Sequence, residues 1–570
     1  MKRGLLVFFI VVAACASLAY AGGAKEPKAG AASPSSGAAT GPSAPKDPNL
    51  NPPGVLPIAK KPVTLTVGLA QSTNVLSYAY ADNFQTKWMQ DRSNVKLELT
   101  LFPATDANQK LDLMIASRSA LPDVLVRMGI ENDTVRNKYG LAGAILPLND
   151  YYDRLGAFFD KAVARIAGQT GGMTREELFN YTKSADGRLY GTIHYVPTIQ
   201  NCYSYRVWMN EKWLKKLGLA EPKTQEEFLA VLRAFRDKDP NGNGRKDEIP
   251  MIGSAGGWRS NPLDWLMNQF LYVDGSGNYY LLKNGTLDVA YDKEEWRNGL
   301  RFAKSLVDEG LLSTLSFTQD FNQYKTQVAA EQQIVGFAVS GSIGGFGNNR
   351  SDYIPSAAIQ GSNGIGWATY VPQVPVVMSA ISRDCKNPEL AFRWLDMGYE
   401  SDEAAMIRER GEPGVDWAFT TEGKTLYDGL GYKPVFRLIT NIWGTPQKKE
   451  WEYLPLPAIY TFKLWAGQVW DGDTANNEYR NSLAVAKLMG HTPPKEDIVF
   501  KIGYTADELD QYAEVRSVLL SYVGESMVRF VMGDMDLNKD WDKYLGELKK
   551  LKYKEILALD QKAYNRTMGK

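Results

Sequence analysis

The sequence Val63-Thr-Leu-Thr-Val-Gly68 begins the part of the chain that we expect to fold, and its apolar residues alternate as in a half-buried strand. A helix around Trp88 is expected next, and a second alternating strand follows at Val95-Lys-Leu-Glu-Leu-Thr-Leu101. A helix over residues 110–117 and a short strand over residues 123–126 complete the run. This strand–helix–strand–helix–strand order predicts an α/β unit with a largely parallel sheet.

Signals for helix ends recur further along the chain. Thr224-Gln-Glu-Glu227 and Thr505-Ala-Asp-Glu508 are capping boxes, in which the threonine and the glutamate satisfy the first free amides of a helix. Asn387-Pro388 places a capping residue before a proline at the first helical position. Trp296 starts an apolar helical face, and Gly310 is placed to end that helix. We find no internal repeat.

The size and charge of the chain limit its class. A chain of 570 residues is too long for one hydrophobic core, so two or more lobes are expected. Its 65 basic and 65 acidic residues balance, which gives neither the basic footprint of a nucleic-acid-binding protein nor a basic membrane face. We therefore predict no nucleic-acid partner.

Residues 1–21 have the pattern of an export signal, with a basic start, an apolar run and small residues after it. Two processing routes fit: cleavage after Ala19-Tyr20-Ala21, or lipidation of Cys15 in Val12-Ala-Ala-Cys15. Residues 22–60 are rich in Gly, Ala, Ser and Pro and are expected to form a disordered linker. The protein is therefore predicted to be exported, periplasmic or lipid-anchored at the outer face of the cytoplasmic membrane, with membrane contact only through that anchor.

Two cysteines, Cys202 and Cys385, lie beyond this leader. A disulfide between them is compatible with an oxidising compartment. The sequence does not show whether the two thiols meet, so the pairing stays open.

The segment Asp239-Pro-Asn-Gly-Asn-Gly-Arg-Lys-Asp-Glu248 has oxygen-bearing side chains at alternate positions and Gly244 in sixth place. This is the spacing of an EF-hand calcium loop, except that position twelve is Pro250 and Glu248 must substitute for the usual glutamate. A solvated turn is the alternative, because Asn, Gly and Asp favour turns. With a helix on one side only, we predict a structural calcium site. Its predicted ligands are Asp239, Asn241, Asn243, Asp247, Glu248 and the backbone carbonyl of Arg245.

Catalytic motifs are missing from the sequence. The two histidines, His194 and His491, stand in unrelated settings, and there is no zinc-protease motif, nucleophile elbow or phosphate-binding loop. The sequence therefore predicts a protein that is not an enzyme. A pair of acidic residues of the kind that glycosidases use is the alternative.

Seven segments carry a resemblance that extends from about Pro62 to Arg566. They are Leu121-Pro-Asp123, Ser184-Ala-Asp-Gly-Arg-Leu-Tyr-Gly191, Trp213-Leu-Lys-Lys-Leu-Gly-Leu219, Pro222-Lys-Thr-Gln-Glu-Glu-Phe228, the Asp239 loop, Asn387-Pro-Glu-Leu-Ala-Phe-Arg-Trp-Leu395 and Gly411-Glu-Pro-Gly-Val-Asp-Trp417. Together they resemble family 1 of the extracellular solute-binding proteins of bacterial ABC importers, which includes LipO-type lipoproteins and alginate-oligosaccharide-binding proteins. The resemblance implies a two-lobed, periplasmic-binding-protein-like α/β fold of type II, with the ligand cleft between the lobes.

The resemblance also implies how the chain is divided. The first lobe is expected to contain residues 61–195 and about 358–410, and the second about 196–357 and 411–570. The calcium loop 239–248 then belongs to the second lobe, away from the cleft. Hinge closure around the ligand would present a surface to the permease.

The function that the resemblance implies is capture of an extracellular oligosaccharide by a monomeric, non-enzymatic component of an ABC importer, which delivers it to the permease subunits. A peptide or another solute is the alternative ligand. More distant alternatives are a polysaccharide-degrading enzyme and a surface adhesion protein with the same fold.

Sugars present apolar C–H faces and a rim of hydroxyls, so a sugar site needs flat aromatic rings beside hydrogen-bonding groups. We therefore predict cleft residues in glycine-rich or irregular loops, where a rigid scaffold exposes them. Packing in the core is the alternative role for each. The predicted ligand-binding residues are Trp258, Trp417, Glu412, Trp443, Tyr78, Tyr80 and Tyr205.

Overall fold

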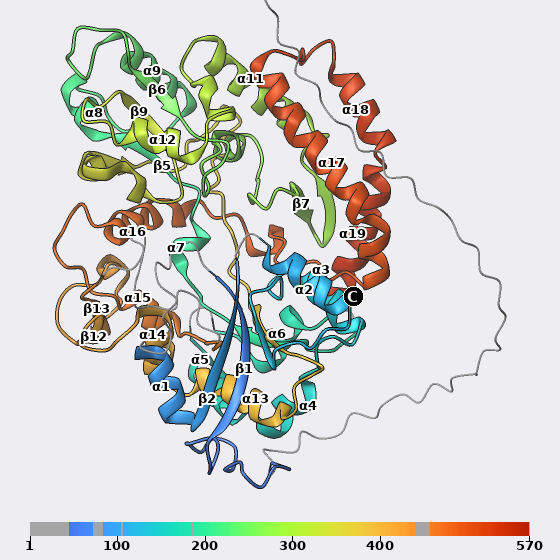
Figure 1. The fold of residues 1–570 in the computed structure, drawn as a ribbon. Coiled ribbons are helices and arrows are strands. Elements are labelled where there is room, and N and C mark those ends of the chain that lie inside the picture. Colours follow the sequence, from blue (N-terminus) through green and yellow to red (C-terminus); the bar gives the residue numbers. More distant parts are fainter. Residues whose placement is uncertain are drawn as a thin grey trace, which may run out of the picture. The chain divides into compact units, whose positions relative to one another are not determined.

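The computed structural model describes residues 45–71, 84–103, 106–169, 172–184, 186–440 and 456–568 (Figure 1), apart from the side chains of residues 506, 509–511 and 513. The export signal, Cys15, Tyr78, Tyr80 and Trp443 lie outside the described residues, as do residues 22–44 of the predicted linker. The prediction that the linker extends to residue 60 is wrong, because Leu50, Ile58 and Ala59 are buried in the core of the first sheet.

The first sheet has five strands in the order β2-β1-β3-β11-β4. β1 pairs in parallel with β2 and with β3, whereas β11 runs antiparallel to both β3 and β4. The alternating strands predicted around residues 63–68 and 95–101 are confirmed, and so is their parallel pairing. The strands are β1 (Val63–Ala70), β2 (Val95–Phe102), β3 (Val124–Val126), β4 (Thr192–His194) and β11 (Val376–Ile381).

The helices around this sheet bury two apolar clusters, and Leu111, Leu125 and Tyr139 belong to the smaller one. Val67 and Val126 of the sheet pack with Phe159 and Trp394, which come from helices more than 200 residues apart. Burial of such side chains is the main stabilising contribution to a domain core. The helices are α1 (Phe84–Ser93), α2 (Ala107–Ala116), α3 (Asp133–Leu141), α4 (Asn149–Leu155), α5 (Ala157–Ile166), α6 (Arg175–Thr182), α13 (Pro388–Asp396), η5 (Met397–Tyr399) and α14 (Asp402–Arg410).

The second sheet has four strands in the order β10-β5-β9-β6. β5 is antiparallel to β10 and β9, and β6 is parallel to β9. Its core contains Phe228, Phe337, Trp296 and Phe530, the last from the long helix α17 (Ala506–Met532). The strands are β5 (Val207–Asn210), β6 (Ile249–Ile252), β9 (Val335–Val339) and β10 (Tyr353–Pro355).

Most of the remaining helices pack around the second sheet, and α17, α18 and α19 lie side by side (Figure 1). These helices are α8 (Glu211–Leu217), α9 (Gln225–Asp237), α10 (Pro262–Leu266), α11 (Glu294–Asp308), α12 (Phe321–Val328), α16 (Asn477–Leu488), α17 (Ala506–Met532), α18 (Trp541–Lys550) and α19 (Tyr553–Thr567). Short 3-10 turns are η2 (Met267–Gln269), η3 (Thr314–Phe317), η4 (Ile343–Asp352), η6 (Asp428–Leu430), η7 (Met489–His491) and η8 (Lys495–Asp497).

The helix-end signals read from the sequence are confirmed. Thr224 and Thr505 each form a complete capping box with the glutamate three residues later. The Asn387 side chain accepts a 3.1 Å hydrogen bond from the Leu390 amide, with Pro388 at the first helical position. Gly310, just after α11, has φ = +67°, a conformation that glycine adopts at little cost.

Two hairpins complete the fold: β7 (Tyr280–Lys283) with β8 (Thr286–Val289), and β12 (Trp417–Phe419) with β13 (Phe436–Leu438). Trp417 and Phe436 of the second hairpin pack with Ile407 and Tyr460, and Trp88 of α1 lies against this cluster. The segment that includes α15 (Phe462–Ala466) therefore runs beside the first sheet before the chain reaches α16.

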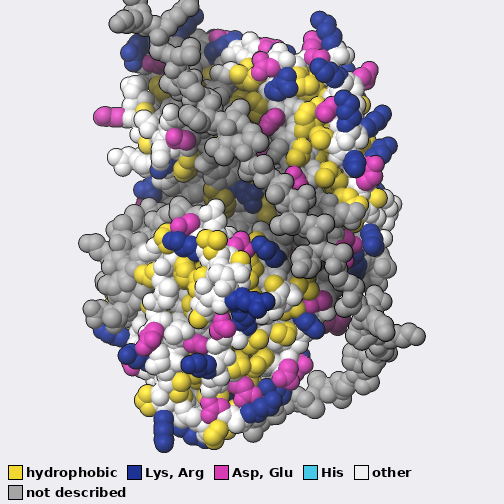
Figure 2. All heavy atoms as spheres, turned by 45° about the vertical axis from the view of Figure 1, so that its right-hand side comes forward, with side chains coloured by type: hydrophobic (Ala, Val, Ile, Leu, Met, Phe, Trp, Pro, Cys, Tyr) yellow, Lys and Arg dark blue, Asp and Glu magenta, His cyan; other side chains and the backbone are white. Residues whose placement is uncertain are grey.

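The described thiols are both free and buried. Cys202 belongs to a cluster with Tyr203 and Phe462, whereas Cys385 belongs to the first-sheet core, so the pairing that the sequence left open is not formed. None of the described helices is long and apolar enough to cross a membrane. On the face shown in Figure 2, basic and acidic side chains lie interspersed.

Candidate functional site

Two chain segments lead between the sheets and meet beside one pocket. Residues 195–206 run from β4 to β5 through the short helix α7 (Ile199–Cys202), and residues 356–375 return from β10 to β11. The Val371 amide donates a 2.8 Å hydrogen bond to the Cys202 carbonyl, so the two crossings are joined directly. A third segment, which contains Ala458, is attached just after β4. There the backbone amide of Tyr195 donates a 2.9 Å hydrogen bond to the Ala458 carbonyl.

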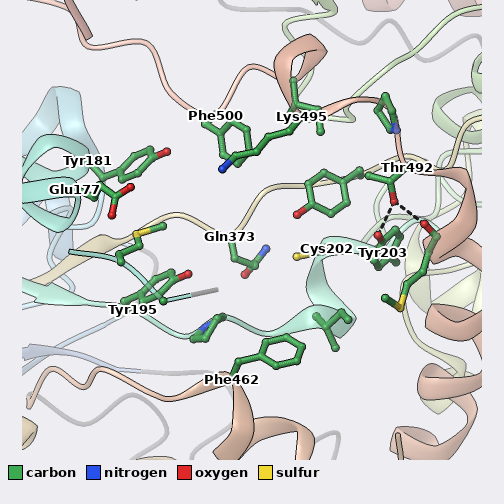
Figure 3. Close-up of a pocket in the computed structure, with 18 of the residues that line it drawn as sticks. Glu177, Tyr181, Tyr195, Cys202, Tyr203, Gln373, Phe462, Thr492, Lys495 and Phe500 are labelled. Carbon is green, nitrogen blue, oxygen red and sulfur yellow. Dashed lines mark hydrogen bonds between the residues drawn. The ribbon is translucent and has the colours of Figure 1, made fainter. Parts of the chain in front are cut away.

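The pocket at these crossings has a volume of about 690 Å³, within the range of sites for small ligands. We call it the aromatic pocket, because tyrosine and phenylalanine rings line it from several distant segments (Figure 3). Its aromatic residues are Tyr181, Tyr195, Tyr203, Tyr370, Tyr432, Phe462 and Phe500. Polar residues that line it include Glu177, Cys202, Gln373, Thr492 and Lys495.

The two charged residues in the described lining of the aromatic pocket come from different segments. Glu177 lies on α6, where its carboxylate accepts the Thr174 amide at 2.7 Å and so caps the helix. Lys495 comes from the C-terminal part of the chain, and its Nζ lies 5.8 Å from the ring centroid of Phe500. Figure 3 shows Glu177 and Tyr181 together on one side, with Phe500 and Lys495 on another segment.

The rings of the pocket are positioned by one another and by hydrogen bonds. The Tyr203 hydroxyl lies 2.5 Å from Thr492 Oγ1, which itself donates to the Met489 carbonyl at 3.0 Å. The Tyr203 and Tyr370 rings meet edge to face with centroids 5.3 Å apart, an arrangement that aromatic quadrupoles favour. Tyr203 therefore holds the first crossing against both the returning crossing and the residues after α16.

Burial moves ionisable groups of the pocket further from their charged forms. It raises the pKa of Tyr195, Tyr203 and Tyr370, and it also raises the pKa of the Cys202 thiol. A neutral tyrosine hydroxyl can both donate and accept a hydrogen bond. The aromatic pocket thus combines flat apolar faces with groups that can pair with the hydroxyls of a polar ligand.

Both histidines have structural contacts. His194 Nδ1 accepts a hydrogen bond from the Ala458 amide at 3.1 Å, and His491 Nδ1 lies 3.0 Å from the Gly366 carbonyl. Burial, with the nearby positive charges of Arg408 and Arg127, holds the pKa of His194 well below its usual value. His194 is therefore neutral and ties the third segment to β4.

The two predicted tryptophans that the structure describes lie elsewhere. Trp258 is 49 % exposed, and one face of its ring packs on Gly341. Trp417 is only 1 % exposed, and its Nε1 donates to the Gly411 carbonyl at 3.0 Å. Neither is among the described residues that line the aromatic pocket.

Glu412 and Tyr205 are also outside the described lining. The Glu412 amide donates to the Asp416 carboxylate at 2.8 Å within the turn before β12. Tyr205 is 4 % exposed; its hydroxyl donates to the Gly275 carbonyl at 2.6 Å and accepts from Arg259 at 2.6 Å. Buried contacts therefore occupy the polar end of the Tyr205 side chain.

The tyrosines that do line the pocket carried one signal in the sequence. The first lobe was predicted to end near residue 195. Tyr195 lies at that boundary, and Tyr203 lies eight residues after it. A chain that leaves one lobe for another passes the cleft, so aromatic residues at such a crossing are cleft candidates. Phe462 and Phe500 carried no comparable local signal.

The Asp239–Glu248 segment forms a compact turn directly after α9. Asp239 accepts hydrogen bonds from the amides of Gly242 at 2.9 Å, Asn243 at 3.1 Å and Gly244 at 3.0 Å. The Asn243 side-chain amide donates to both Asp247 carboxylate oxygens at 3.0 Å. Gly244 has φ = +74°, which explains a glycine in sixth place.

Glu248 supplies the observation that bears on a metal. Its Oε1 is buried and has no hydrogen-bond partner among the described residues. Burial raises the pKa of Glu248, and the negative charges of Asp239 and Asp247 raise it further. Three carboxylates and two asparagine oxygens in one turn, with one buried oxygen unpaired, fit a hard cation such as Ca²⁺. The described residues contain no cluster of three or more His, Cys, Asp or Glu arranged for a metal; this turn would need its asparagines as ligands.

The structure is an α/β protein with two sheets, and the aromatic pocket, its candidate ligand site, lies where the chain crosses between them. Residues 72–405 match the family described as bacterial extracellular solute-binding protein, and the chain belongs to this family. The resemblance found in the sequence is thereby confirmed.

Three relatives illustrate the match. The fructooligosaccharide ABC transporter substrate-binding protein FusA of Streptococcus pneumoniae is 24 % identical over 509 residues, which cover 84 % of this chain and 86 % of FusA. Lipoprotein LipO of Bacillus subtilis is 27 % identical over 230 residues, 40 % of this chain and 41 % of LipO. The third is a solute-binding protein of Bifidobacterium longum infantis, described as HMO-binding and ABC-transporter-associated, whose structure is 17 % identical.

The solved structures of two of these relatives, FusA and the B. longum infantis protein, share the fold. FusA in complex with kestose superposes with a TM-score of 0.72 at 21 % identity, over 89 % of this chain and 99 % of FusA. The B. longum infantis protein also gives 0.72, over the same shares. A FusA structure described as an EF-hand mutant, in complex with fructo-nystose, gives 0.71 at 22 % identity, over the same shares. The predicted two-lobed binding-protein fold is therefore confirmed.

Proposed function

We propose that this protein is the substrate-binding component of an ABC importer and that it captures an extracellular oligosaccharide in the aromatic pocket. The observation that carries the proposal is the lining of that pocket, in which aromatic rings from the crossings stand beside neutral hydroxyl groups. The family membership and the named ligands of the relatives support the same ligand class.

The chemistry of the pocket suits a sugar in two ways. The C–H faces of a sugar ring lose contact with water when they lie on rings such as Phe462 and Phe500. The hydroxyls of the sugar both donate and accept, as the neutral tyrosines and Gln373 can. Because both kinds of group are present at one site, the pocket can select an oligosaccharide over a purely apolar solute.

We further propose that the two lobes centre on the two sheets and close by a hinge at the crossings, presenting a surface to the permease. The first lobe would contain residues 61–195 and about 358–410. Trp417 and Tyr460 pack beside α1, and this supports adding the segment that contains them to the first lobe. The second lobe would contain about 196–357 and the C-terminal helices.

The same proposal covers the assembly and the location of the protein. We propose a monomer that binds its ligand without chemical change, is exported, and is periplasmic or tethered through a lipid on Cys15. The membership of an extracellular family supports export, and the lipoprotein LipO among its relatives supports an anchor.

Calcium belongs to the proposal as a structural ion. Asp239, Asn241, Asn243, Asp247, Glu248 and the carbonyl of Arg245 would hold it, and it would supply the positive charge that the buried Glu248 oxygen lacks. The existence of an EF-hand mutant of FusA supports a loop of this kind in a relative.

Calorimetry tests the proposal directly. The purified protein is titrated with kestose, nystose, a human milk oligosaccharide, an alginate oligosaccharide, an oligogalacturonide and a peptide library. Binding of one glycan, with no new reducing ends after incubation, is the expected result. Tight binding of peptides and no response to any glycan would overturn the oligosaccharide assignment, and release of reducing ends would establish an enzyme instead.

A further inference from the structure

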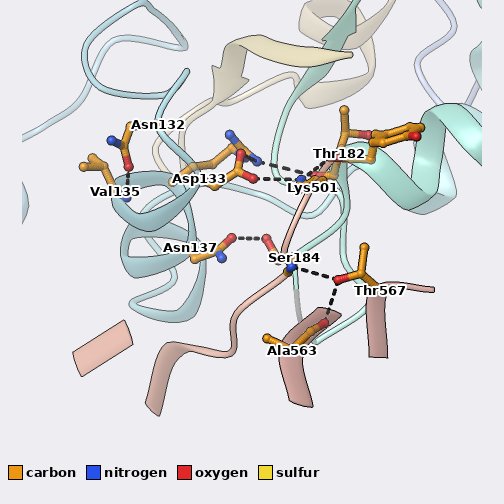
Figure 4. Close-up of polar contacts among 12 residues, drawn as sticks. Asn132, Asp133, Val135, Asn137, Thr182, Ser184, Lys501, Ala563 and Thr567 are labelled. Carbon is orange, nitrogen blue, oxygen red and sulfur yellow. Dashed lines mark hydrogen bonds and ion pairs between the residues drawn. The ribbon is translucent and has the colours of Figure 1, made fainter. Parts of the chain in front are cut away.

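Lys501 connects a C-terminal segment to two helices of the first sheet. Its Nζ lies 2.7 Å from Asp133 Oδ2, in the first turn of α3, and it also donates to the Tyr181 carbonyl on α6. Figure 4 shows the Lys501 side chain reaching Asp133 and the end of α6. The Lys501 ammonium group thus contacts two residues that lie more than 300 positions earlier in the sequence.

The acceptor side of this contact is held in place by other residues. Asp133 Oδ1 lies 2.5 Å from Arg136 Nη2, and the Arg136 side chain is only 1 % exposed. Arg136 Nη1 donates in turn to the Ile130 carbonyl at 2.9 Å. The Asp133 carboxylate is therefore oriented by α3 itself, with its second oxygen left for Lys501.

The two partners respond differently to burial, which lowers the pKa of the Lys501 ammonium although the Asp133 charge opposes that effect. Burial alone would raise the pKa of Asp133, but the positive charges of Lys501 and Arg136 outweigh it and lower that pKa. The Lys501 side chain is 14 % exposed and that of Asp133 is 48 % exposed, so solvent screens the pair in part. A partly exposed pair contributes little to global stability, and its effect is then mainly on local geometry.

The Lys501 segment, residues 495–503, is anchored on the other side by the second half of the fold. Val499 and Ile502 pack against the cluster of Tyr280 and Tyr564. The Gly503 amide donates to Thr567 Oγ1 at 2.8 Å. This attachment to β7 and α19 does not involve Lys501.

The same segment forms part of the aromatic pocket. Ile498 and Phe500 line it, and Tyr181, whose carbonyl accepts from Lys501, lines it from α6. Lys501 therefore connects the backbone of Tyr181 with the segment that contains Phe500, and both of these residues line the pocket.

We propose that Lys501 is a positioning residue of the aromatic pocket: its contacts with Asp133 and the Tyr181 carbonyl hold the Phe500 segment against α6 and set how open the pocket is. The proposal rests on the proposed function in taking this pocket as the ligand site. Its geometric content holds for the ligand-free protein and can be measured there.

Cys202 provides a readout that needs no ligand. It lines the aromatic pocket and is 8 % exposed, whereas Cys385, which is 9 % exposed, lies in the first-sheet core and serves as an internal control. Alkylation by iodoacetamide, followed by peptide mass mapping, gives the rate at each thiol. In Lys501→Met, which keeps the apolar stem, we expect several-fold faster alkylation of Cys202 and an unchanged rate at Cys385.

Two further comparisons make the test specific. Lys183→Met removes an exposed ammonium that donates to the nearby Asn180 Oδ1 at 2.7 Å, and it should leave both rates unchanged. Asp133→Asn should raise the Cys202 rate as Lys501→Met does, and the double variant should add little, because both remove the same interaction. In the wild type, 1 M NaCl should raise the Cys202 rate, with a smaller effect in Lys501→Met.

Equal Cys202 rates in wild type and both folded single variants would overturn the proposal. If Lys501→Met does not fold, Asp133→Asn and the salt series give the same decision. Failure of every glycan to bind would instead overturn the proposed function, and the thiol rates would still show whether Lys501 controls access to the pocket.

Discussion

The amide of Val371 donates a 2.8 Å hydrogen bond to the carbonyl of Cys202. This bond joins the outgoing and returning crossings at the wall of the aromatic pocket, where Tyr203 and Tyr370 meet edge to face. The aromatic pocket is thus built on the connections between the two sheets, so a change in the path of either crossing must change the pocket.

Removal of a pocket ring should weaken ligand binding. Phe500→Ala deletes an aromatic face whose burial is worth about 1.5–3 kcal/mol, so we expect roughly a 10- to 100-fold loss of affinity for the bound glycan by calorimetry.

Trp258→Ala is the matched control, because this half-exposed ring lies outside the described lining. Its affinity should stay within about twofold of the wild type. A large loss in Trp258→Ala with none in Phe500→Ala would move the ligand site to the sequence-predicted loop.

Calcium should raise the melting temperature, because an ion bound only to the folded state stabilises it by about 2.7 kcal/mol at 100 times its Kd. Scanning calorimetry in calcium and in EDTA measures the difference. Equal curves, with no metal in the purified protein, would mean that the loop is only a turn.

The variant Glu248→Gln distinguishes the effect of a bound calcium ion from the stability of the metal-free turn. Burial and the neighbouring carboxylates raise the pKa of Glu248, so its charge destabilises the metal-free fold above the ordinary pKa of a glutamate. The variant should therefore melt higher than the wild type in EDTA at pH 7 and bind calcium more weakly. A lower melting temperature in EDTA would contradict this account.

Asp396 should make the stability depend on pH. Its carboxylate is fully buried and accepts the Phe158 amide at 3.0 Å and the Phe159 amide at 2.9 Å at the start of α5. Burial raises its pKa to about 7, above the unfolded value. Its contribution to stability is therefore complete below about pH 4 and is lost as the pH rises through 7.

Urea unfolding from pH 4 to 8 checks this sign. The wild type should lose on the order of a few kcal/mol relative to Asp396→Asn across that range. The variant also loses one acceptor, which lowers its stability by a similar amount at every pH. Parallel curves for the two proteins would show that Asp396 does not titrate in this range.

Because Cys202 and Cys385 are free thiols, we expect the stability of the protein not to depend on reductant. Because Cys202 and Cys385 lie in different clusters, dithiothreitol should not shift the melting temperature. Alkylation in denaturant without reductant should modify both. Protection of both thiols until reductant is added would reveal a disulfide.

Local signals were enough for much of the fold. The alternation around Leu65 and Val67 predicted a strand that buries those side chains, and the capping boxes at Thr224 and Thr505 predicted the starts of α9 and α17. These features depend on residues within a few positions of each other, so the sequence carries them directly.

Exposure of single aromatic residues did not follow from the sequence. Trp417 stands beside a glycine-rich turn, yet Ile407, Phe436 and Tyr460 enclose its ring. Tyr205 lies two residues from Tyr203, but its hydroxyl is held by Gly275 and Arg259 rather than turned to the pocket. Neighbours distant in the chain decide which ring faces a cavity.

The sequence by itself determined the α/β class, the family and the turn at Asp239, because periodicity, capping and ligand spacing are local properties. Only the tertiary structure decided the aromatic pocket and the Lys501 contact. Their members lie between residues 133 and 503, on segments that meet only after both sheets and their crossings have formed. The position of a side chain in such a site depends on the packing of the whole chain, which no short stretch of sequence contains.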